Sequence, residues 1–205
     1  MKGYNQLAPV YDRLARFVFG KAMTQSQMIF LGQLQNCESV LVLGGGTGWW
    51  LNDLLKRFPD LKITFVDSSS EMIRRAKMKL KLKHQVDFVH GTIEDVSMDR
   101  KFDGVILYYF LDLFPGDRLP VVIEKIFNHM NANSIWLVSD FINRKKWHTA
   151  FLKMMYLFFY LLTGSTSKQL PDWQNKLENA GLLKIEEQTF YGKFILAGFY
   201  ISDKL

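Results

Sequence analysis

Four glycines and one aspartate have the spacing that says most about chemistry in this sequence. Gly44, Gly46 and Gly48 alternate with other residues, and Gly45 lies between the first two. Glycines let a ligand approach the main chain closely, and a helix that begins there offers free N–H groups to a polar or anionic group. Asp67 follows at about the 20-residue distance expected of an acid that binds ribose hydroxyls. The pattern therefore predicts a site for a nucleotide-like ligand.

The elements that must position these residues are a strand and a helix on either side of the glycine turn. Residues 40–43 form a short apolar run, which predicts a buried parallel strand. Residues 49–58 carry apolar side chains at helical spacing, so the three pieces open a βαβ unit. A dinucleotide fingerprint would need glycine at position 49, where the sequence has Trp49. This difference disfavours a nicotinamide-dependent dehydrogenase.

With this glycine turn and its distant acid, the chain resembles the class I S-adenosylmethionine-dependent methyltransferases, and among them the ubiquinone/menaquinone-biosynthesis type. The resemblance implies an α/β fold: a Rossmann-like, seven-stranded, mostly parallel sheet with helices on both faces, an antiparallel C-terminal hairpin and a small helical cap. It also implies S-adenosylmethionine as cofactor, with S-adenosylhomocysteine as its product. The expected function is in-line methyl transfer to a small acceptor, apolar or aromatic.

The resemblance also nominates the residues around the cofactor. Tyr11 matches a tyrosine that reaches the methionine part of the cofactor, and Ser68 and Met72 match positions that flank the adenine ring. Tyr108, at the end of a predicted strand, is a candidate for the pocket wall, with ordinary packing as the alternative. The predicted cofactor-binding residues are Tyr11, Gly44, Gly45, Gly46, Gly48, Asp67, Ser68, Met72, Thr92, Ile93 and Tyr108.

Two positions depart from the family pattern. Relatives often carry an acid where this chain has Val42, and another where it has Thr92, which in them accepts from the adenine amino group. Thr92 still offers a hydroxyl, and the main chain at Ile93 could bond the ring. These departures keep open an alternative function, a non-catalytic or regulatory S-adenosylmethionine-binding protein that uses its apolar helix for a membrane or protein partner.

The sequence does not identify a catalytic residue. A general base is needed only where the acceptor is a poor nucleophile such as a phenol or an alcohol. His148, at the start of the predicted cap, and Asp140, at the end of the fifth predicted strand, are the candidates that we retain. Asp140 could orient the substrate or simply cap the following loop. Since cysteine and histidine are not grouped at metal-ligand spacing, no metal is predicted.

The chain reads as one methyltransferase domain with four segments. Residues 1–36 are predicted to form an N-terminal helical lid, 37–141 the cofactor-binding core, 142–180 a helical cap insertion and 181–205 a hairpin of the same sheet. The lid should contain a helix over residues 11–20, with Leu14, Phe17 and Val18 on one face, and a second helix that begins at Thr24. The helix after Asp67 should begin at Ser68, which has capping-box spacing to Glu71.

The predicted cap contains a run of apolar and aromatic residues over 151–162. The run is too short to span a bilayer, which takes about 20 residues. Because it is apolar on all sides, we expect its helix to be buried on more than one side. Tyr11, Tyr156 and Phe159 should face the acceptor, opposite Tyr108.

Composition bounds the environment and the partners. The 205-residue chain has a formal net charge of +6 and a single cysteine, Cys37, which rules out an intramolecular disulfide and fits a reducing, cytoplasmic location. The basic residues between Arg74 and Lys83 lack interleaved aromatics, so a solvated helix face is favoured over a nucleic-acid site. A small-molecule substrate is the expected partner, with peripheral membrane contact as an alternative. The sequence does not indicate an oligomeric state.

Overall fold

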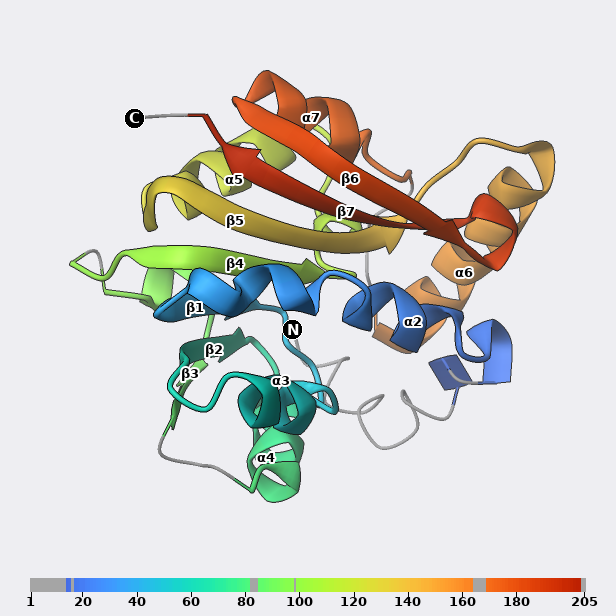
Figure 1. The fold of residues 1–205 in the computed structure, drawn as a ribbon. Coiled ribbons are helices and arrows are strands. Elements are labelled where there is room, and N and C mark those ends of the chain that lie inside the picture. The colour runs from blue at the N-terminus through green and yellow to red at the C-terminus, as the bar shows by residue number, and fades with distance from the viewer. Residues whose placement is uncertain (1–13, 16, 82–84, 98, 164–168, 204–205) are drawn as a thin grey trace.

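One mixed sheet of seven strands forms the body of the molecule (Figure 1). The computed structural model describes residues 14–15, 17–81, 85–97, 99–163 and 169–203. The strand order is β3-β2-β1-β4-β5-β7-β6. The strands that run parallel are β1 (Ser39–Leu43), β2 (Lys62–Asp67), β3 (Val86–His90), β4 (Phe102–Tyr108) and β5 (Met130–Phe141). The last two, β6 (Leu182–Phe190) and β7 (Ile195–Ser202), form the predicted antiparallel hairpin, with β7 against β5.

The central strands place alternate side chains in two cores, because successive residues of a strand point to opposite faces. Val40 and Val42 pack with the short 3-10 helix η1 (Leu31–Asn36), α3 (Leu51–Arg57) and α4 (Ser70–Lys79). Leu41 and Leu43 pack with α5 (Leu119–Phe127) and α7 (Trp173–Asn179) on the other face. The predicted Rossmann-like sheet with helices on both faces is thus confirmed.

A third cluster lies beside the carboxyl ends of β4 and β5, where α2 (Ala22–Met28) and α6 (Lys146–Thr163) approach the sheet (Figure 1). Its fully packed side chains come from five segments of the chain: Phe19, Met23, Phe141, Leu152, Phe194 and Ile195. The Phe19 ring contacts Phe141 at a centroid distance of 5.5 Å and Phe151 of α6 at 5.9 Å. Aromatic contacts of this kind fix α2 and α6 against the sheet.

Hydrogen bonds to strand ends hold α2 in place. The hydroxyl of Tyr108 donates to the carbonyl of Gln27 at 2.6 Å, and the hydroxyl of Ser139 donates to the carbonyl of Ser26 at 2.7 Å. The Ser26 and Tyr109 hydroxyls are bonded at 2.8 Å. Because most of these groups are buried, each bond would be costly to leave unmade. The carboxyl end of β4 is therefore hydrogen-bonded to α2 through Tyr108 and Tyr109.

Two predicted helix starts are wrong. Thr24 lies inside α2 and donates to the Lys21 carbonyl at 2.7 Å, and the helix ends at Met28, so the single helix predicted from Thr24 is divided. The N-cap of α4 is Ser69, one residue after the predicted Ser68, and its hydroxyl accepts from the N–H of Met72 at 3.2 Å. Ser69 still has extended backbone, with φ −100° and ψ 112°, so the helix begins at Ser70 and Ser68 lies one residue too early to cap it.

The two predicted amphipathic segments are less buried than expected. Phe17 is 89% exposed, although it was predicted to share a buried face with Leu14 and Val18. On α6, Met154 and Leu157 are 58% and 59% exposed, so this helix is buried on one side rather than several. Within the described parts of the chain, no helix has the length and apolarity to cross a membrane. Peripheral membrane contact through α6 stays a prediction.

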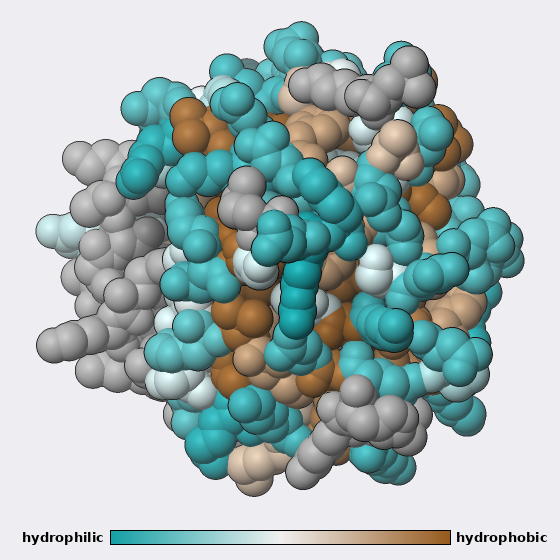
Figure 2. Space-filling view, turned by 90° about the vertical axis from the view of Figure 1, so that its left-hand side faces the viewer, coloured by the Kyte–Doolittle hydropathy of each residue, from teal (hydrophilic) through white to brown (hydrophobic). Residues whose placement is uncertain are grey.

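On the face that lies at the left of Figure 1, hydrophilic side chains form most of the surface and surround a central hydrophobic area (Figure 2). This is the side away from α6. Scattered apolar area of this kind is normal on a folded protein, because polar atoms cannot cover the whole surface.

The position of the α4 cap can be tested by substitution. We expect Ser69→Ala to lower the free energy of unfolding by about 1 kcal/mol, because the N–H of Met72 loses its acceptor. Ser70→Ala, the matched control, removes an exposed hydroxyl from the first helical position and should be neutral within about 0.5 kcal/mol. Urea denaturation of both variants measures the difference, and an equal effect of the two substitutions would contradict the assigned cap.

Candidate functional site

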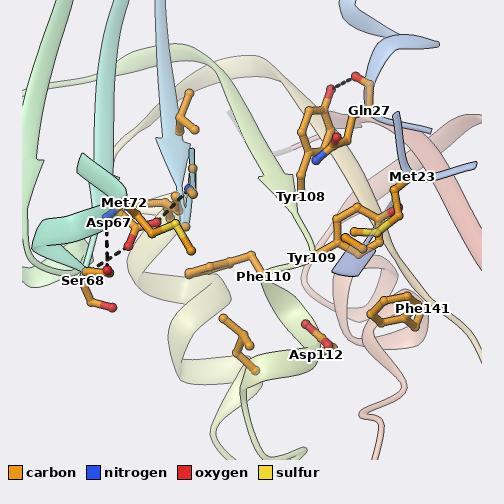
Figure 3. A pocket seen from close by; sticks show the side chains of 18 of the residues that line it. Met23, Gln27, Asp67, Ser68, Met72, Tyr108, Tyr109, Phe110, Asp112 and Phe141 are labelled. Carbon is orange, nitrogen blue, oxygen red and sulfur yellow. Dashed lines mark hydrogen bonds between the residues drawn. The ribbon is translucent and has the colours of Figure 1, made fainter. Parts of the chain in front are cut away.

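A cavity of about 1320 Å³ lies at the carboxyl ends of the parallel strands. One part is polar and is lined by the glycine turn, the end of β2 and the turn after β3. The other part is aromatic and is lined by the end of β4, α2 and α6. Figure 3 shows Asp67, Ser68 and Met72 in the first part, Tyr108, Tyr109 and Phe141 in the second, and Phe110 between them.

Asp67 joins the two turns of the polar part. One carboxylate oxygen accepts from the N–H of Gly46 at 2.8 Å, and the other accepts from the N–H of Ser69 at 2.8 Å (Figure 3). Burial raises the pKa of Asp67, while these two N–H groups and the nearby His90 act in the opposite direction. A carboxylate has room for about four hydrogen bonds, so this side chain can still accept from ligand hydroxyls.

The four predicted glycines have different roles. Gly44, Gly45 and Gly46 line the cavity, whereas Gly48 does not. Gly46 has a φ of +60° and open space where a side chain would point, so a Cβ there would enter the cavity. Gly48 has a φ of +55°, and a Cβ on it would lie 2.7 Å from Leu51 Cδ1. Gly48 is therefore required for the packing of α3, and the structure places no ligand surface on it.

The turn after β3 brings Thr92 and Ile93 to the cavity. The N–H of Thr92 donates to Asp95 at 2.7 Å, which closes the 3-10 turn η3 (Ile93–Asp95). The Thr92 hydroxyl donates to Glu94, which also accepts from Lys125. The bond from Lys125 is the main reason that the pKa of Glu94 falls to about 2. A carboxylate thus lies two residues after the position where relatives often have theirs.

The aromatic part surrounds its space with rings and thioethers. Tyr108 is buried, and its ring contacts Trp50 edge-on at a centroid distance of 5.5 Å. Tyr109 has a left-handed φ of 54°, a strained conformation for a residue of its size. The other lining side chains of this part include Met23, Phe110, Phe141, Phe151, Met155 and Tyr156. Such a surface suits a flat or apolar molecule.

Two carboxyl groups lie close together at the aromatic end. Asp140 is completely buried, and one oxygen accepts from the N–H groups of Leu111 and Asp112 at 2.9 and 3.1 Å. Its other oxygen accepts from the N–H of Phe141 at 2.7 Å. Burial and then the charge of Asp112 raise the pKa of Asp140 well above its usual range. Asp140 does not line the cavity, and these bonds hold the short turn η4 (Leu111–Leu113).

Asp112 lines the cavity itself. Burial raises its pKa to about 7, which makes it a group that changes charge near neutral pH. Its side chain points toward the space between Phe110 and Phe141 (Figure 3). Asp112 is not among the residues that the sequence predicts for the site. The signal available was its position as the one acid in the aromatic and aliphatic run of residues 108–114.

The remaining candidates lie away from the cavity or outside the described residues. His148 is fully buried, its Nδ1 accepts from the N–H of Arg144 at 3.0 Å, and its ring packs on Phe194 at 5.2 Å. Burial lowers the pKa of His148, and the residue does not line the cavity. Tyr11 and the side chain of Phe159 lie outside the described part of the chain. Tyr156 lines the same cavity as the glycine turn.

Comparisons with known proteins agree with this geometry. Residues 40–133 match the family model described as a methyltransferase domain. The malonyl-[acyl-carrier protein] O-methyltransferase of Priestia megaterium is 30% identical over 142 residues, 69% of this chain and 51% of that protein. The demethylmenaquinone methyltransferase of Thermotoga maritima is 32% identical over 127 residues, 60% of this chain and 54% of that protein. The chain thus spans about half the length of these curated relatives.

The fold has close structural neighbours. A Burkholderia thailandensis 1,6-didemethyltoxoflavin-N1-methyltransferase, solved with 1,6-didemethyltoxoflavin and S-adenosylhomocysteine bound, superposes with a TM-score of 0.70 over 98% of this chain and 87% of that one, at 15% identity. The fold is therefore that of the Rossmann-like methyltransferases. The family model and these relatives support assignment of the chain to the class I S-adenosylmethionine-dependent methyltransferases.

The different roles of Gly46 and Gly48 lead to a stability test. Both residues have a left-handed φ, so each alanine substitution should cost about 1 kcal/mol in backbone strain. Gly48→Ala should cost about 1–3 kcal/mol more, because its Cβ overlaps Leu51 in a packed core. Chemical denaturation compares the two variants. A Gly46→Ala variant that is as unstable as Gly48→Ala would contradict the open space assigned to Gly46.

The raised pKa of Asp112 should make stability depend on pH. The carboxyl of the unfolded chain ionises near its usual pKa of 3.8, whereas that of the folded chain ionises near 7, so the folded state becomes less favourable as pH rises between them. Asp112→Asn should remove this loss and raise the free energy of unfolding above pH 7, by about 1.4 kcal/mol for each unit by which folding raises the pKa of the carboxyl.

Below the usual pKa of the carboxyl, the gain from Asp112→Asn should disappear, because the group is then protonated in both states. The measurement is the free energy of unfolding against pH for wild type, for Asp112→Asn and for the control Asp117→Asn. Asp117 is exposed, and its substitution should give a difference that does not change with pH. A pH-independent effect of Asp112→Asn would show that Asp112 is not buried as a carboxyl.

Proposed function

We propose that this chain binds S-adenosylmethionine in the polar part of the cavity and transfers its methyl group to a small apolar or aromatic acceptor in the other part. The observation that carries the proposal is the single cavity that joins the glycine turn and Asp67 to an aromatic chamber. The match to the methyltransferase family model and its relatives supports a transferase over the non-catalytic alternative.

The residues of the polar part fit this methyl donor. The carboxylate of Asp67 would accept from the ribose hydroxyls, and the open backbone at Gly46 leaves room beside them. Met72, Thr92 and Ile93 line the cavity and, by the family resemblance, would lie beside the adenine ring. The donor supplies a methyl group on a positively charged sulfur. The contribution of the chain is to hold the acceptor against that methyl and to exclude water.

The segments predicted as lid and cap support the acceptor half of the proposal. Leu14 and Val18 line the cavity from the N-terminal side, and Phe151, Met155 and Tyr156 line it from α6. Enclosure of this kind strengthens the electrostatic contacts inside a site and removes competing water. The names of the relatives include a carrier-protein substrate and a small molecule, and the aromatic lining supports the small molecule for this chain.

The binding of S-adenosylhomocysteine is the direct test. We expect Asp67→Ala to weaken it about tenfold or more, because each hydrogen bond to a charged group contributes about 1.5–3 kcal/mol. Asp67→Asn keeps one acceptor oxygen and should lose less. Asp60→Ala, which removes an exposed acid from the turn before β2, is the matched control and should leave binding unchanged.

Calorimetry with S-adenosylmethionine, S-adenosylhomocysteine and NAD in turn distinguishes the donor from a dinucleotide. Thermal unfolding of each variant separates lost binding from lost folding, which matters because Asp67 also holds two turns. An unchanged dissociation constant for a folded Asp67→Ala variant, or a preference for NAD, would overturn the assignment.

A further inference from the structure

The aromatic end of the cavity contains polar atoms that the rest of the described chain does not satisfy. Asp112 Oδ1 and the Tyr156 hydroxyl are both buried without a hydrogen-bond partner among the described residues. Both side chains line the cavity. Buried polar atoms normally have hydrogen-bond partners. Two unsatisfied atoms that line one cavity therefore indicate a ligand that supplies those partners.

The two side chains come from different elements and act on the same space. Asp112 lies on η4 after β4, and Tyr156 lies in the middle of α6. After burial, the charges of Asp112 and Asp140 raise the pKa of Tyr156, so the three groups interact electrostatically. Phe110 and Phe141 flank the carboxyl of Asp112, so aromatic rings form part of its surroundings (Figure 3).

Asp140 fixes the position of Asp112. It accepts from the N–H of Asp112 and of the residue before it, so the carboxyl of Asp112 is presented by a held turn and not by a free loop. Among the described residues, the ionisable groups that interact with Asp112 are Asp140 and Tyr156, and neither is a cation. The cations that line the same cavity are Lys21, Lys79, Arg118 and Lys125, and none of them contributes to the pKa of Asp112. A carboxylate acceptor beside Asp112 would therefore meet like charge.

We propose that Asp112 and Tyr156 bind the hydroxyl group of an apolar acceptor, and that the carboxylate of Asp112 takes the proton of this hydroxyl. The proposal rests on the proposed function. The acceptor oxygen forms a bond to the methyl carbon of the sulfonium donor, the electron pair of the carbon–sulfur bond stays on sulfur, and the acceptor proton passes to Asp112. The Tyr156 hydroxyl orients the acceptor oxygen.

The ionisation of Asp112 suits this role. Burial raises its pKa to about 7, so a large fraction is present as carboxylate at neutral pH and the group is still basic enough to take a proton. General bases work best when their pKa lies near the operating pH. An aliphatic or aromatic hydroxyl is also the kind of acceptor that needs such a base.

The test uses binding, so it does not depend on knowing the natural acceptor. The probes are 2-naphthol and 2-naphthoate, which present a hydroxyl and a carboxylate on the same apolar ring system. Each is titrated calorimetrically into the full chain saturated with S-adenosylhomocysteine. We expect wild type to bind 2-naphthol about tenfold more tightly than 2-naphthoate, because Asp112 accepts from the first and repels the second.

Substitutions assign this preference to the two side chains. Asp112→Asn should bring the affinities for the two probes to within about threefold, since the repelling charge is removed. Tyr156→Phe should weaken 2-naphthol binding about threefold or more. Its affinity for 2-naphthoate should stay as low as that of wild type. Asp60→Asn is the control, because it removes an exposed acid that does not line the cavity and should leave the preference intact.

A pH series gives a readout that a purely structural role would not move. The affinity of wild type for 2-naphthol should fall severalfold as the pH drops from one unit above 7 to one unit below, whereas Asp112→Asn should show no such change. If Asp112→Asn does not fold, Tyr156→Phe and the wild-type pH series still test the proposal.

Three results would overturn the proposal: equal or tighter binding of 2-naphthoate by wild type, an unchanged preference in folded Asp112→Asn, or no binding of 2-naphthol to a chain that binds S-adenosylhomocysteine. Failure to bind S-adenosylhomocysteine contradicts the proposed function instead. In that case the same titrations without it still decide whether Asp112 and Tyr156 recognise a hydroxyl.

Discussion

The carboxylate of Asp67 is the contact on which the polar part of the site depends. It accepts from the N–H of Gly46 in the glycine turn after β1 and from the N–H of Ser69 at the start of α4. These two bonds fix the distance between the loops that follow β1 and β2. A carboxylate this buried is tolerated only with such donors, because an unpaired charge in the same place would be strongly unfavourable. The partners of Asp67 thus stabilise the charge and build the ligand surface together.

The aromatic part depends on contacts that are distant in the sequence. Tyr108 and Ser139, at the ends of adjacent strands, each donate to a carbonyl of α2. The rings of Phe19, Phe141 and Phe194 join the segment before α2 to β5 and the hairpin. Closing these long loops costs conformational entropy, which the burial of aromatic surface offsets. The chamber therefore exists only when the N-terminal helix, the sheet and α6 are assembled.

This difference explains how far the sequence could predict the structure. The strand, glycine turn and acid are local signals, and they correctly indicated the parallel sheet; the hairpin that ends it also followed from a short turn between apolar runs. The cap of α4 is Ser69 and not Ser68, because Ser69 still has extended backbone, which sequence spacing does not show. The one-sided exposure of α6 and the burial of Asp112 depend on packing partners distant in the sequence, so composition could not reveal either.

The two ends of the cavity use the same chemical group in opposite ways. Asp67 is surrounded by donors, so its charge is balanced inside the protein and it presents spare lone pairs to a ligand rich in hydroxyls. Asp112 faces apolar rings and a second carboxyl that has taken the nearby backbone N–H groups, so burial raises its pKa to about 7. The N–H groups and His90 around Asp67 offset part of the rise that burial causes in its pKa, whereas burial dominates at Asp112. Since the physical difference lies in the neighbours and not in the side chains, the position of each acid in the fold decides whether it can hold a ligand or take part in chemistry.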